Sequence, residues 1–328
     1  MTKRTVVFTG ERQISIESSP VPEPAPEEVM VQTKLSAISA GTEMLVYRNQ
    51  FPQDLSLDAT IEGLGQAFAY PLTYGYTTVG EIIACGNNVS ESYLHQRVFA
   101  FHPHCSHFTT TPDSVMQVPH DINAEDALFL ANMETAINLI QDGKPILGEK
   151  VLVIGQGVVG LLVTAILATF PLESLTTVDT LEVRRTAATE AGAHQSVAPA
   201  ALTDTDFDLV FELSGNPAAL NTAIDRVGYG GRIVVGSWYG QKQASLNLGG
   251  HFHRNRVQII SSQVSTIAPE LTARWDKARR FNVVWEMIRR FEPSRWISHR
   301  FAVESAAQAY QLLDMQPETT LQVVFTYS

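Results

Sequence analysis

The chain has 328 residues, of which 45 % are hydrophobic and 17 % are charged. This length allows two domains, and this balance is typical of a packed globular protein rather than a disordered one. A net charge of −11 excludes nucleic acid as the main partner, because phosphate binding needs a basic surface.

No segment predicts secretion or insertion into a membrane. The first residues lack the apolar stretch of a signal peptide, and the longest apolar run, residues 158–170, is too short to span a bilayer. Two cysteines, Cys85 and Cys105, are too few for a disulfide framework. We therefore expect a cytoplasmic protein without a membrane partner.

The first 122 residues predict an all-β, barrel-like unit. β-branched residues gather in short segments, and Gly, Pro and Asn separate these segments. The many expected strands include residues 5–10, 27–39, 77–86 and 96–101, and a proline-rich loop covers residues 18–28. Residues 124–143 then have the length and the three-to-four-residue apolar spacing of a helix.

From residue 149 onward the expected strands alternate with helices. This alternation is typical of βαβ units, so we expect a doubly wound parallel sheet covered on both faces. Strands are expected at residues 151–155, 175–179, 195–198, 208–215, 231–238 and 257–263, with helices at 158–170 and 182–192. After residue 266 a helix rich in Arg and Trp leads to segment 301–315 and a closing strand at 321–328.

A glycine-rich turn follows the strand at residues 151–155. Gly155, Gly157 and Gly160 form a G-x-G-x-x-G pattern, with Val158 and Val159 opening the next helix. The first glycine permits a tight turn, the second lets the backbone approach a pyrophosphate, and the third lets the helix pack on the strand. The N–H groups of the helix start favour phosphate. The pattern predicts a Rossmann dinucleotide site; the alternative is a Rossmann-like domain without a cofactor.

An acidic residue ends the second expected strand of this region. Asp179 lies nineteen residues after Gly160, where a carboxylate can accept hydrogen bonds from both ribose hydroxyls and repel a 2′-phosphate. This favours NAD over NADP. Arg184 and Arg185 follow and could pair with a phosphate, which leaves NADP open.

With these features the chain resembles the medium-chain dehydrogenase/reductase superfamily of zinc-type alcohol dehydrogenases. The landmarks are residues 37–43, 75–80, 96–98 and 149–155. The resemblance implies an α/β fold in which a GroES-like barrel domain (residues 1–122 and 266–328) accompanies a Rossmann domain (residues 123–265). It implies cofactor binding in a cleft between the two, with further contacts from Ser214, Gly215, Gly236, Ser237 and Trp238. Residues 39–43 are also similar to those of bacteriochlorophyllide dehydrogenases.

The chain departs from the family at the positions of the zinc ligands. Ala40 stands where zinc-dependent members have a cysteine, and Tyr76 and Thr77 replace their His-Glu pair. Residues 131–133 contain no cysteine for the third ligand, and the four-cysteine lobe is absent. Because alanine cannot ligate a metal, we expect no catalytic zinc.

Without zinc, hydrogen-bond donors must stabilise and protonate an alkoxide. Thr42 matches the family's relay hydroxyl, and Tyr76 could donate to a substrate oxygen. The segment 101–108 holds three histidines and a cysteine, of which His104 and His107 are the preferred acid/base candidates. A metal site and a purely structural polar turn remain alternatives for this cluster. We expect Glu43 and Glu134 to pair with neighbouring donors.

These observations predict an oxidoreductase that transfers a hydride between NAD(H) and a secondary alcohol or ketone, a small-molecule substrate. Alternatives are a reductase of enones or quinones in the same superfamily and a non-catalytic NAD(H)-binding sensor or scaffold. The resemblance also implies a homodimer, in which the apolar edge segment 257–264 pairs with its copy.

Overall fold

The computed structural model describes residues 2–52, 55, 65 and 67–328. Contacts divide the chain into two compact units: unit 1 contains the residues up to Ala131 together with Glu292–Ser328, and unit 2 contains Asn132–Phe291. Unit 1 therefore receives both ends of the chain. None of the helices in the described residues is long and apolar enough to cross a membrane.

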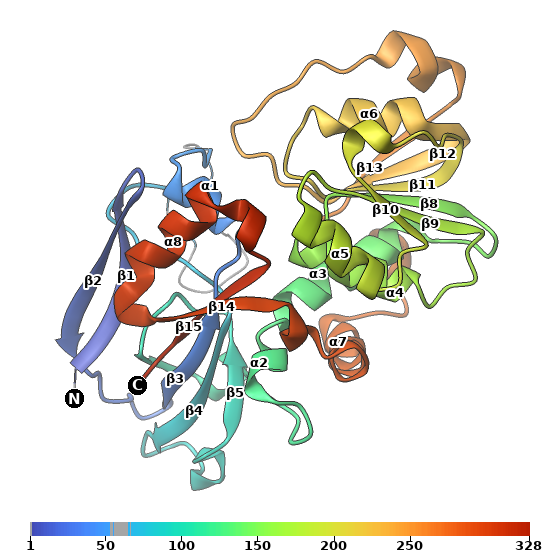
Figure 1. The fold of residues 1–328 in the computed structure, drawn as a ribbon. Helices are drawn as coiled ribbons and strands as arrows, with labels where there is room; N and C mark the ends of the chain where they lie inside the picture. The colour runs from blue at the N-terminus through green and yellow to red at the C-terminus, as the bar shows by residue number, and fades with distance from the viewer. Residues whose placement is uncertain (1, 53–54, 56–64, 66) are drawn as a thin grey trace. The chain divides into compact units, whose positions relative to one another are not determined.

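Unit 1 is built on a two-stranded antiparallel sheet and a larger sheet that is antiparallel except for the parallel pair β14 and β15 (Figure 1). Alternate residues of its central strand, β3 (Val29–Ala37), are buried, as expected for a strand with one face on a core. The smaller sheet is a hairpin of two strands, β1 (Thr2–Gly10) and β2 (Gln13–Pro20). The larger sheet has the order β14-β15-β3-β4-β5-β7, with β6 also paired to β3. Its other strands are β4 (Thr78–Cys85), β5 (Arg97–Ala100), β6 (His107–Thr110), β7 (Val115–Gln117), β14 (Ile297–Ala302) and β15 (Gln322–Thr326).

The described part of unit 1 also contains three α-helices: α1 (Glu43–Tyr47), α2 (Ala124–Ala127) and α8 (Ala306–Met315). The buried face of α8 packs onto the first hairpin and β15. In this core the ring of Tyr310 lies 5.1 Å from that of Phe8 and 6.2 Å from that of Phe325. A residue near the C-terminus thus reaches the centre of the N-terminal barrel.

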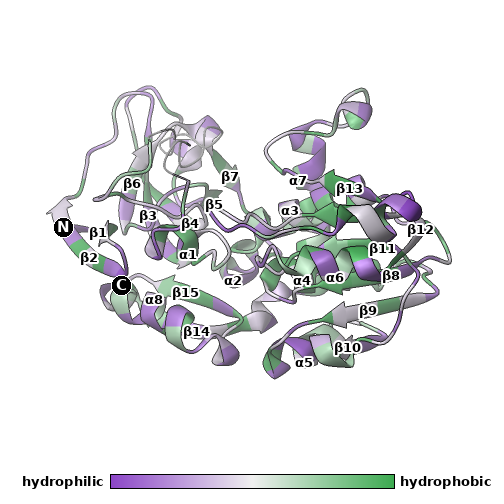
Figure 2. Cartoon of the chain, turned by 90° about the horizontal axis from the view of Figure 1, so that it is seen from above, coloured by the Kyte–Doolittle hydropathy of each residue, from purple (hydrophilic) through white to green (hydrophobic). Residues whose placement is uncertain are grey.

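Unit 2 contains a six-stranded parallel sheet in the order β10-β9-β8-β11-β12-β13. In chain order this is 3-2-1-4-5-6, the doubly wound arrangement of a Rossmann fold. The strands are β8 (Lys150–Ile154), β9 (Ser174–Val178), β10 (Gln195–Val197), β11 (Phe207–Glu212), β12 (Val227–Val235) and β13 (Gln258–Ser261). Figure 2 shows hydrophobic residues concentrated in the central strands β8 and β11. Most residues of these two strands are buried.

Five α-helices belong to this sheet and its connections: α3 (Leu130–Gly143), α4 (Val158–Leu167), α5 (Glu182–Glu190), α6 (Ala219–Arg226) and α7 (Lys277–Phe291). All residues of α4 from Gly160 onward are buried, because the helix is apolar on every side. This helix begins at the glycine-rich turn and so fixes that turn against the sheet.

The structure confirms the predicted fold class and differs in several elements. The expected helix 124–143 is two helices, α2 and α3, separated by a turn at residues 128–129. The strands β2, β6, β7 and β14 and the helix α6 are not among the segments named from the sequence; β6, β7 and β14 are short and carry little periodic signal. Contacts also group residues 123–131 with unit 1 and residues 266–291 with unit 2. The domain bounds expected from the sequence lie between residues 122 and 123 and between residues 265 and 266.

Candidate active site

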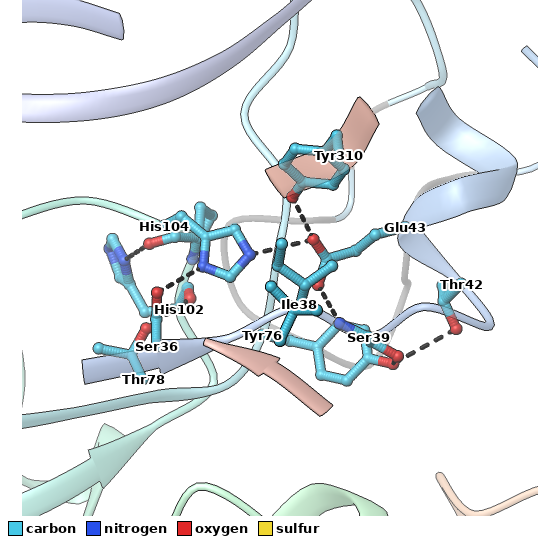
Figure 3. A network of polar contacts seen from close by, with 12 residues as sticks. Ser36, Ile38, Ser39, Thr42, Glu43, Tyr76, Thr78, His102, His104 and Tyr310 are labelled. Atoms are coloured by element: carbon cyan, nitrogen blue, oxygen red, sulfur yellow. Dashed lines mark hydrogen bonds and ion pairs between the residues drawn. The ribbon is translucent and has the colours of Figure 1, made fainter. Parts of the chain in front are cut away.

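Three partly exposed hydroxyl groups meet in unit 1 (Figure 3). The Tyr76 phenol donates a hydrogen bond to Ser39 Oγ at 2.5 Å and lies 3.3 Å from Thr42 Oγ1. Ser39 and Thr42 belong to the connection between β3 and α1, and Tyr76 precedes β4. We name these three side chains the hydroxyl cluster. The two predicted catalytic hydroxyls are thus neighbours, joined by a serine that was not singled out from the sequence.

A buried network lies beside the hydroxyl cluster, and we define it as Ser36, Glu43, His104, Tyr310 and Tyr327. Glu43 Oε1 accepts the Ser39 backbone N–H at 2.7 Å, and Oε2 accepts the Tyr310 hydroxyl and contacts His104 Nε2 at 3.0 Å. Glu43 and His104 have no exposed surface. Glu43 therefore has the neighbouring donors that its sequence context predicted, and His104 lies behind the hydroxyls rather than at the surface.

The other members of the histidine-rich segment have different neighbours from His104. His107 is 6 % exposed, its Nδ1 lies 3.0 Å from Ser106 Oγ, and its Nε2 has no partner among them. Burial lowers the pKa of His107, and the nearby Arg4, Lys34 and Lys3 lower it further. The segment therefore separates its two preferred histidines into different surroundings.

His102 and Cys105 complete this segment. The His102 ring stacks on Phe108 with 3.9 Å between centroids, and its Nδ1 lies 2.9 Å from the Pro103 carbonyl oxygen and 3.6 Å from Cys105 Sγ. Burial lowers the pKa of His102 to about 4 and raises the pKa of Cys105 to about 11. A neutral imidazole and a protonated thiol are the forms that these surroundings favour at neutral pH.

The positions that resemble zinc-ligand sites do not fit a metal. Ala40 offers no ligand atom, and the Tyr76 hydroxyl is bonded to Ser39. Across the residues that the structure describes, no group of three His, Cys, Asp or Glu side chains could hold a metal ion.

The glycine-rich turn in unit 2 fits a dinucleotide. Gly155 has φ +93°, and a Cβ at Gly160 would lie 2.0 Å from the Gly155 carbonyl oxygen, so both positions require glycine. Gly157, which precedes α4, has nothing within 4 Å of its Cβ position, which leaves an open approach to the helix N-terminus. Val158 and Val159 lie in the first helical turn, whose N–H groups are suited to bind a pyrophosphate.

Asp179 connects this turn to the end of β9. Its Oδ2 accepts the Gln156 N–H at 2.7 Å and its Oδ1 accepts the Leu181 N–H at 2.9 Å. Arg184 Nη1 lies 3.9 Å from Oδ2, and the Arg185 guanidinium donates to the Asp179 and Thr180 carbonyl oxygens. The carboxylate is thereby held at the sheet edge where the adenosine ribose binds in Rossmann folds.

Two further loops meet at the carboxyl ends of β11 and β12. Gly215 N–H donates to Ser237 Oγ at 2.8 Å, and the Gly236 and Ser237 N–H groups donate to the Glu212 carbonyl oxygen. Ser214 and Tyr239 donate to the buried Glu212 carboxylate. Trp238 is 39 % exposed. Glu212 was not predicted; it organises the loops that the resemblance assigned to the cofactor.

Comparison with known proteins agrees with this architecture. The family model described as "Zinc-binding dehydrogenase" matches residues 158–281. The 2-desacetyl-2-hydroxyethyl bacteriochlorophyllide A dehydrogenase of Cereibacter sphaeroides is 25 % identical over 278 residues, covering 80 % of this chain and 82 % of that protein.

Two solved structures share the fold over 99 % of both chains in each pair. One is an alcohol dehydrogenase from Escherichia coli in complex with NADH, with a TM-score of 0.79 and 18 % identity. The other is a zinc-binding dehydrogenase from Sinorhizobium meliloti bound to NADP, with a TM-score of 0.79 and 16 % identity.

These relatives are oxidoreductases. The chain is similar to alcohol-dehydrogenase-like proteins of the medium-chain dehydrogenase/reductase superfamily.

Proposed function

We propose that this protein is a zinc-independent oxidoreductase that transfers a hydride between NAD(H) and a secondary alcohol or ketone. The observation that carries the proposal is the hydroxyl cluster of Ser39, Thr42 and Tyr76, in which Tyr76 stands at a position where the family has a zinc ligand. The open glycine turn with Asp179 supports the cofactor.

Gly155, Gly157 and Gly160 would hold the pyrophosphate, together with the N–H groups of Val158 and Val159 at the start of α4. Asp179 would accept a ribose hydroxyl, and Ser214, Gly215, Gly236, Ser237 and Trp238 would contact the remainder. The nicotinamide ring, when bound, supplies or accepts the hydride. Because Asp179 repels a 2′-phosphate, we propose NAD as the physiological cofactor. Calorimetric titration should show tighter binding of NADH than of NADPH; equal affinities would mean that Arg184 or Arg185 compensates.

The hydroxyl cluster would act on the substrate oxygen. In the reductive direction, negative charge develops on the carbonyl oxygen. The Tyr76 hydroxyl, which donates to Ser39 Oγ in the structure, turns its proton to that oxygen, and the Thr42 hydroxyl donates to it as well. Tyr76 then transfers its proton to that oxygen. The Ser39 hydroxyl donates to the phenolate oxygen that remains, until this oxygen regains a proton from water. Oxidation of an alcohol follows the same steps in reverse.

Removal of the Tyr76 hydroxyl tests this assignment. With NADH and a panel of ketones, Tyr76→Phe should lower kcat on the order of 10²-fold, with the NADH dissociation constant nearly unchanged. Thr42→Val should act in the same direction. Tyr229→Phe is the matched control, since Tyr229 is 73 % exposed and lies in unit 2. Full activity in both cluster variants would overturn the catalytic assignment and return attention to His107.

The same panel separates the alternative functions. Turnover of enones or quinones without ketones would indicate a C=C or quinone reductase. NADH binding without any turnover would indicate a sensor or scaffold.

Zinc independence has a direct measurement. Protein purified without chelators should contain well below one zinc per chain, and a chelator should leave turnover unchanged. Stoichiometric zinc that is lost on mutation of His104 or His107 would overturn the proposal.

We also propose a homodimer. The edge strand β13 pairs with β12 on one side, and its Ile259 is 37 % exposed. An edge strand of this kind favours pairing with a second copy. Light scattering at micromolar concentration should give twice the chain mass of 36.1 kDa; a monomer would contradict the proposal.

A further inference from the structure

Ser39 joins the buried network to the hydroxyl cluster. Its backbone N–H donates to Glu43 Oε1 at 2.7 Å, while its Oγ accepts the Tyr76 hydroxyl at 2.5 Å. Its carbonyl oxygen accepts the Thr42 and Glu43 N–H groups at 3.0 and 2.8 Å. The N–H, the carbonyl oxygen and Oγ of Ser39 are thus all engaged, so the position of Glu43 sets the position of the oxygen that Tyr76 faces (Figure 3).

Glu43 in turn depends on two side chains from distant parts of unit 1. His104 Nε2 lies 3.0 Å from Oε2, and the Tyr310 hydroxyl donates to the same oxygen. Burial and the Glu43 charge raise the pKa of Tyr310 well above its ordinary value, which keeps this phenol protonated as a donor. A carboxylate without exposed surface needs such donors, because an unpaired buried charge is strongly unfavourable.

His104 is itself held on every side. Its Nδ1 lies 2.7 Å from Ser36 Oγ, which lies 2.8 Å from the Tyr327 hydroxyl. Its ring packs edge-on against Phe325 at 5.1 Å, and a Cβ added to Gly75 would lie 2.7 Å from Nε2. Gly75 immediately precedes Tyr76, so the backbone beside the phenol also rests against this imidazole.

We propose that His104 is a positioning residue for the reaction, which through Glu43 and Ser39 holds the Tyr76 hydroxyl in place for the substrate oxygen. The inference rests on the proposed function. His104 touches no substrate. It orients the carboxylate, the carboxylate orients the Ser39 backbone, and Ser39 Oγ fixes the direction of the phenol. A displacement of about 1 Å at a reacting group costs on the order of 10²-fold in rate, so this chain of contacts has a kinetic consequence.

Two amide substitutions separate positioning from packing. The amide nitrogen of His104→Gln reaches the place of Nε2 and keeps the bond to Glu43, whereas that of His104→Asn reaches only the place of Nδ1. Both leave a polar side chain in the same buried space. We expect His104→Asn to lower kcat on the order of 10-fold to 10²-fold, and His104→Gln to stay within about threefold of the parent. His102→Asn, from the same segment and outside the network, is the control and should keep the parent kcat.

The decisive measurement combines these variants with Tyr76→Phe. Because His104 acts through Tyr76, His104→Asn should have almost no further effect on kcat when the phenol hydroxyl is already absent. Equal losses in both backgrounds would show a general structural role and overturn the inference. Equal activity of the two His104 amides would overturn it as well.

A spectroscopic experiment tests the same inference without any measurement of turnover. With ¹³Cζ-labelled tyrosine, the Tyr76 resonance, identified by its absence in Tyr76→Phe, should move in His104→Asn and return in His104→Gln. An unchanged Tyr76 resonance in His104→Asn would contradict the inference but leave the proposed function intact. Full activity of Tyr76→Phe would contradict the proposed function itself. If His104→Asn does not fold, Tyr310→Phe removes the other donor to Glu43 while keeping the ring, and the same displacement of the Tyr76 resonance is required.

Discussion

Two buried carboxylates, Glu43 in unit 1 and Asp179 in unit 2, are assembled in opposite ways. Asp179 is held by backbone N–H groups of Gln156 and Leu181, the nearer of which is two residues away. Glu43 is held by side chains 61 and 267 residues away, His104 and Tyr310, in addition to the nearby Ser39 backbone. Backbone N–H groups near the glycine-rich turn hold Asp179 at the proposed cofactor site. The hydroxyl cluster, by contrast, depends on contacts that form only in the completed fold. Substitutions at Glu43 should therefore affect stability, and those at Asp179 should affect ligand choice.

The largest expected effect is on the free energy of unfolding of Glu43→Ala. The substitution leaves three donors without their buried acceptor, so we expect a loss of about 3–5 kcal/mol in urea denaturation. The control is Glu270→Ala, which breaks the exposed Glu270–Lys144 ion pair and should cost at most about 1 kcal/mol. Similar losses in the two variants would remove the contrast between buried and exposed carboxylates.

We expect low pH to destabilise unit 1 through protonation of His102. Burial lowers its pKa to about 4, below the ordinary value near 6.5. Between these values the unfolded chain binds a proton that the folded chain does not, so stability present at neutral pH is lost as the pH falls from 6.5 to 4. We expect this residue to contribute a decrease on the order of 1–3 kcal/mol over that window.

His102→Asn should flatten the pH dependence of urea unfolding, whereas His120→Asn, which removes an exposed histidine, should not. The same slope in the parent and in His102→Asn would mean that other groups carry the acid sensitivity.

Gly75→Ala should cause a smaller loss in the free energy of unfolding. Gly75 has φ +110°, and the added Cβ would lie 2.7 Å from the His104 ring. We expect a cost of about 1–3 kcal/mol from backbone strain and displacement of the imidazole. Gly230→Ala is the matched control, because Gly230 also has a positive φ, +69°, with nothing within 4 Å of its Cβ position. If thermal denaturation gives equal shifts for both, contact with His104 contributes nothing.

The smallest effect is expected at Asp179. Asp179→Ala should narrow the preference for NADH over NADPH by about tenfold, since one 2′-phosphate repulsion and one ribose hydrogen bond are lost. Asp208→Ala is the control, because Asp208 also accepts a backbone N–H, that of Lys150 at 2.8 Å, but lies at the start of β11. An unchanged ratio of dissociation constants for Asp179→Ala would assign the discrimination to another group.

The dinucleotide region could be predicted because its signals are short-range. Gly155, Gly157 and Gly160 require their conformations within one turn, and Asp179 ends the very next strand. The alternation of strands and helices then fixed the class of sheet, since apolar strands joined by helices can be covered on both faces only in a parallel sheet. The separate helices α2 and α3 escaped prediction because two short helices and one long helix have nearly the same apolar spacing.

By itself the sequence determined the fold class, the dinucleotide turn and the replacement of the zinc-ligand residues, because each follows from residue types at short spacing. Only the tertiary structure decided which hydroxyls meet, that Ser39 joins Thr42 and Tyr76, and that His104 is enclosed with Glu43 and Tyr310 while His107 is not. The physical reason is that a buried polar group takes whichever donors the folded chain brings within about 3 Å. In unit 1 the polar groups that meet come from β3, α1, α8 and the histidine-rich segment, whose meeting is fixed by sheet pairing and core packing rather than by any local pattern.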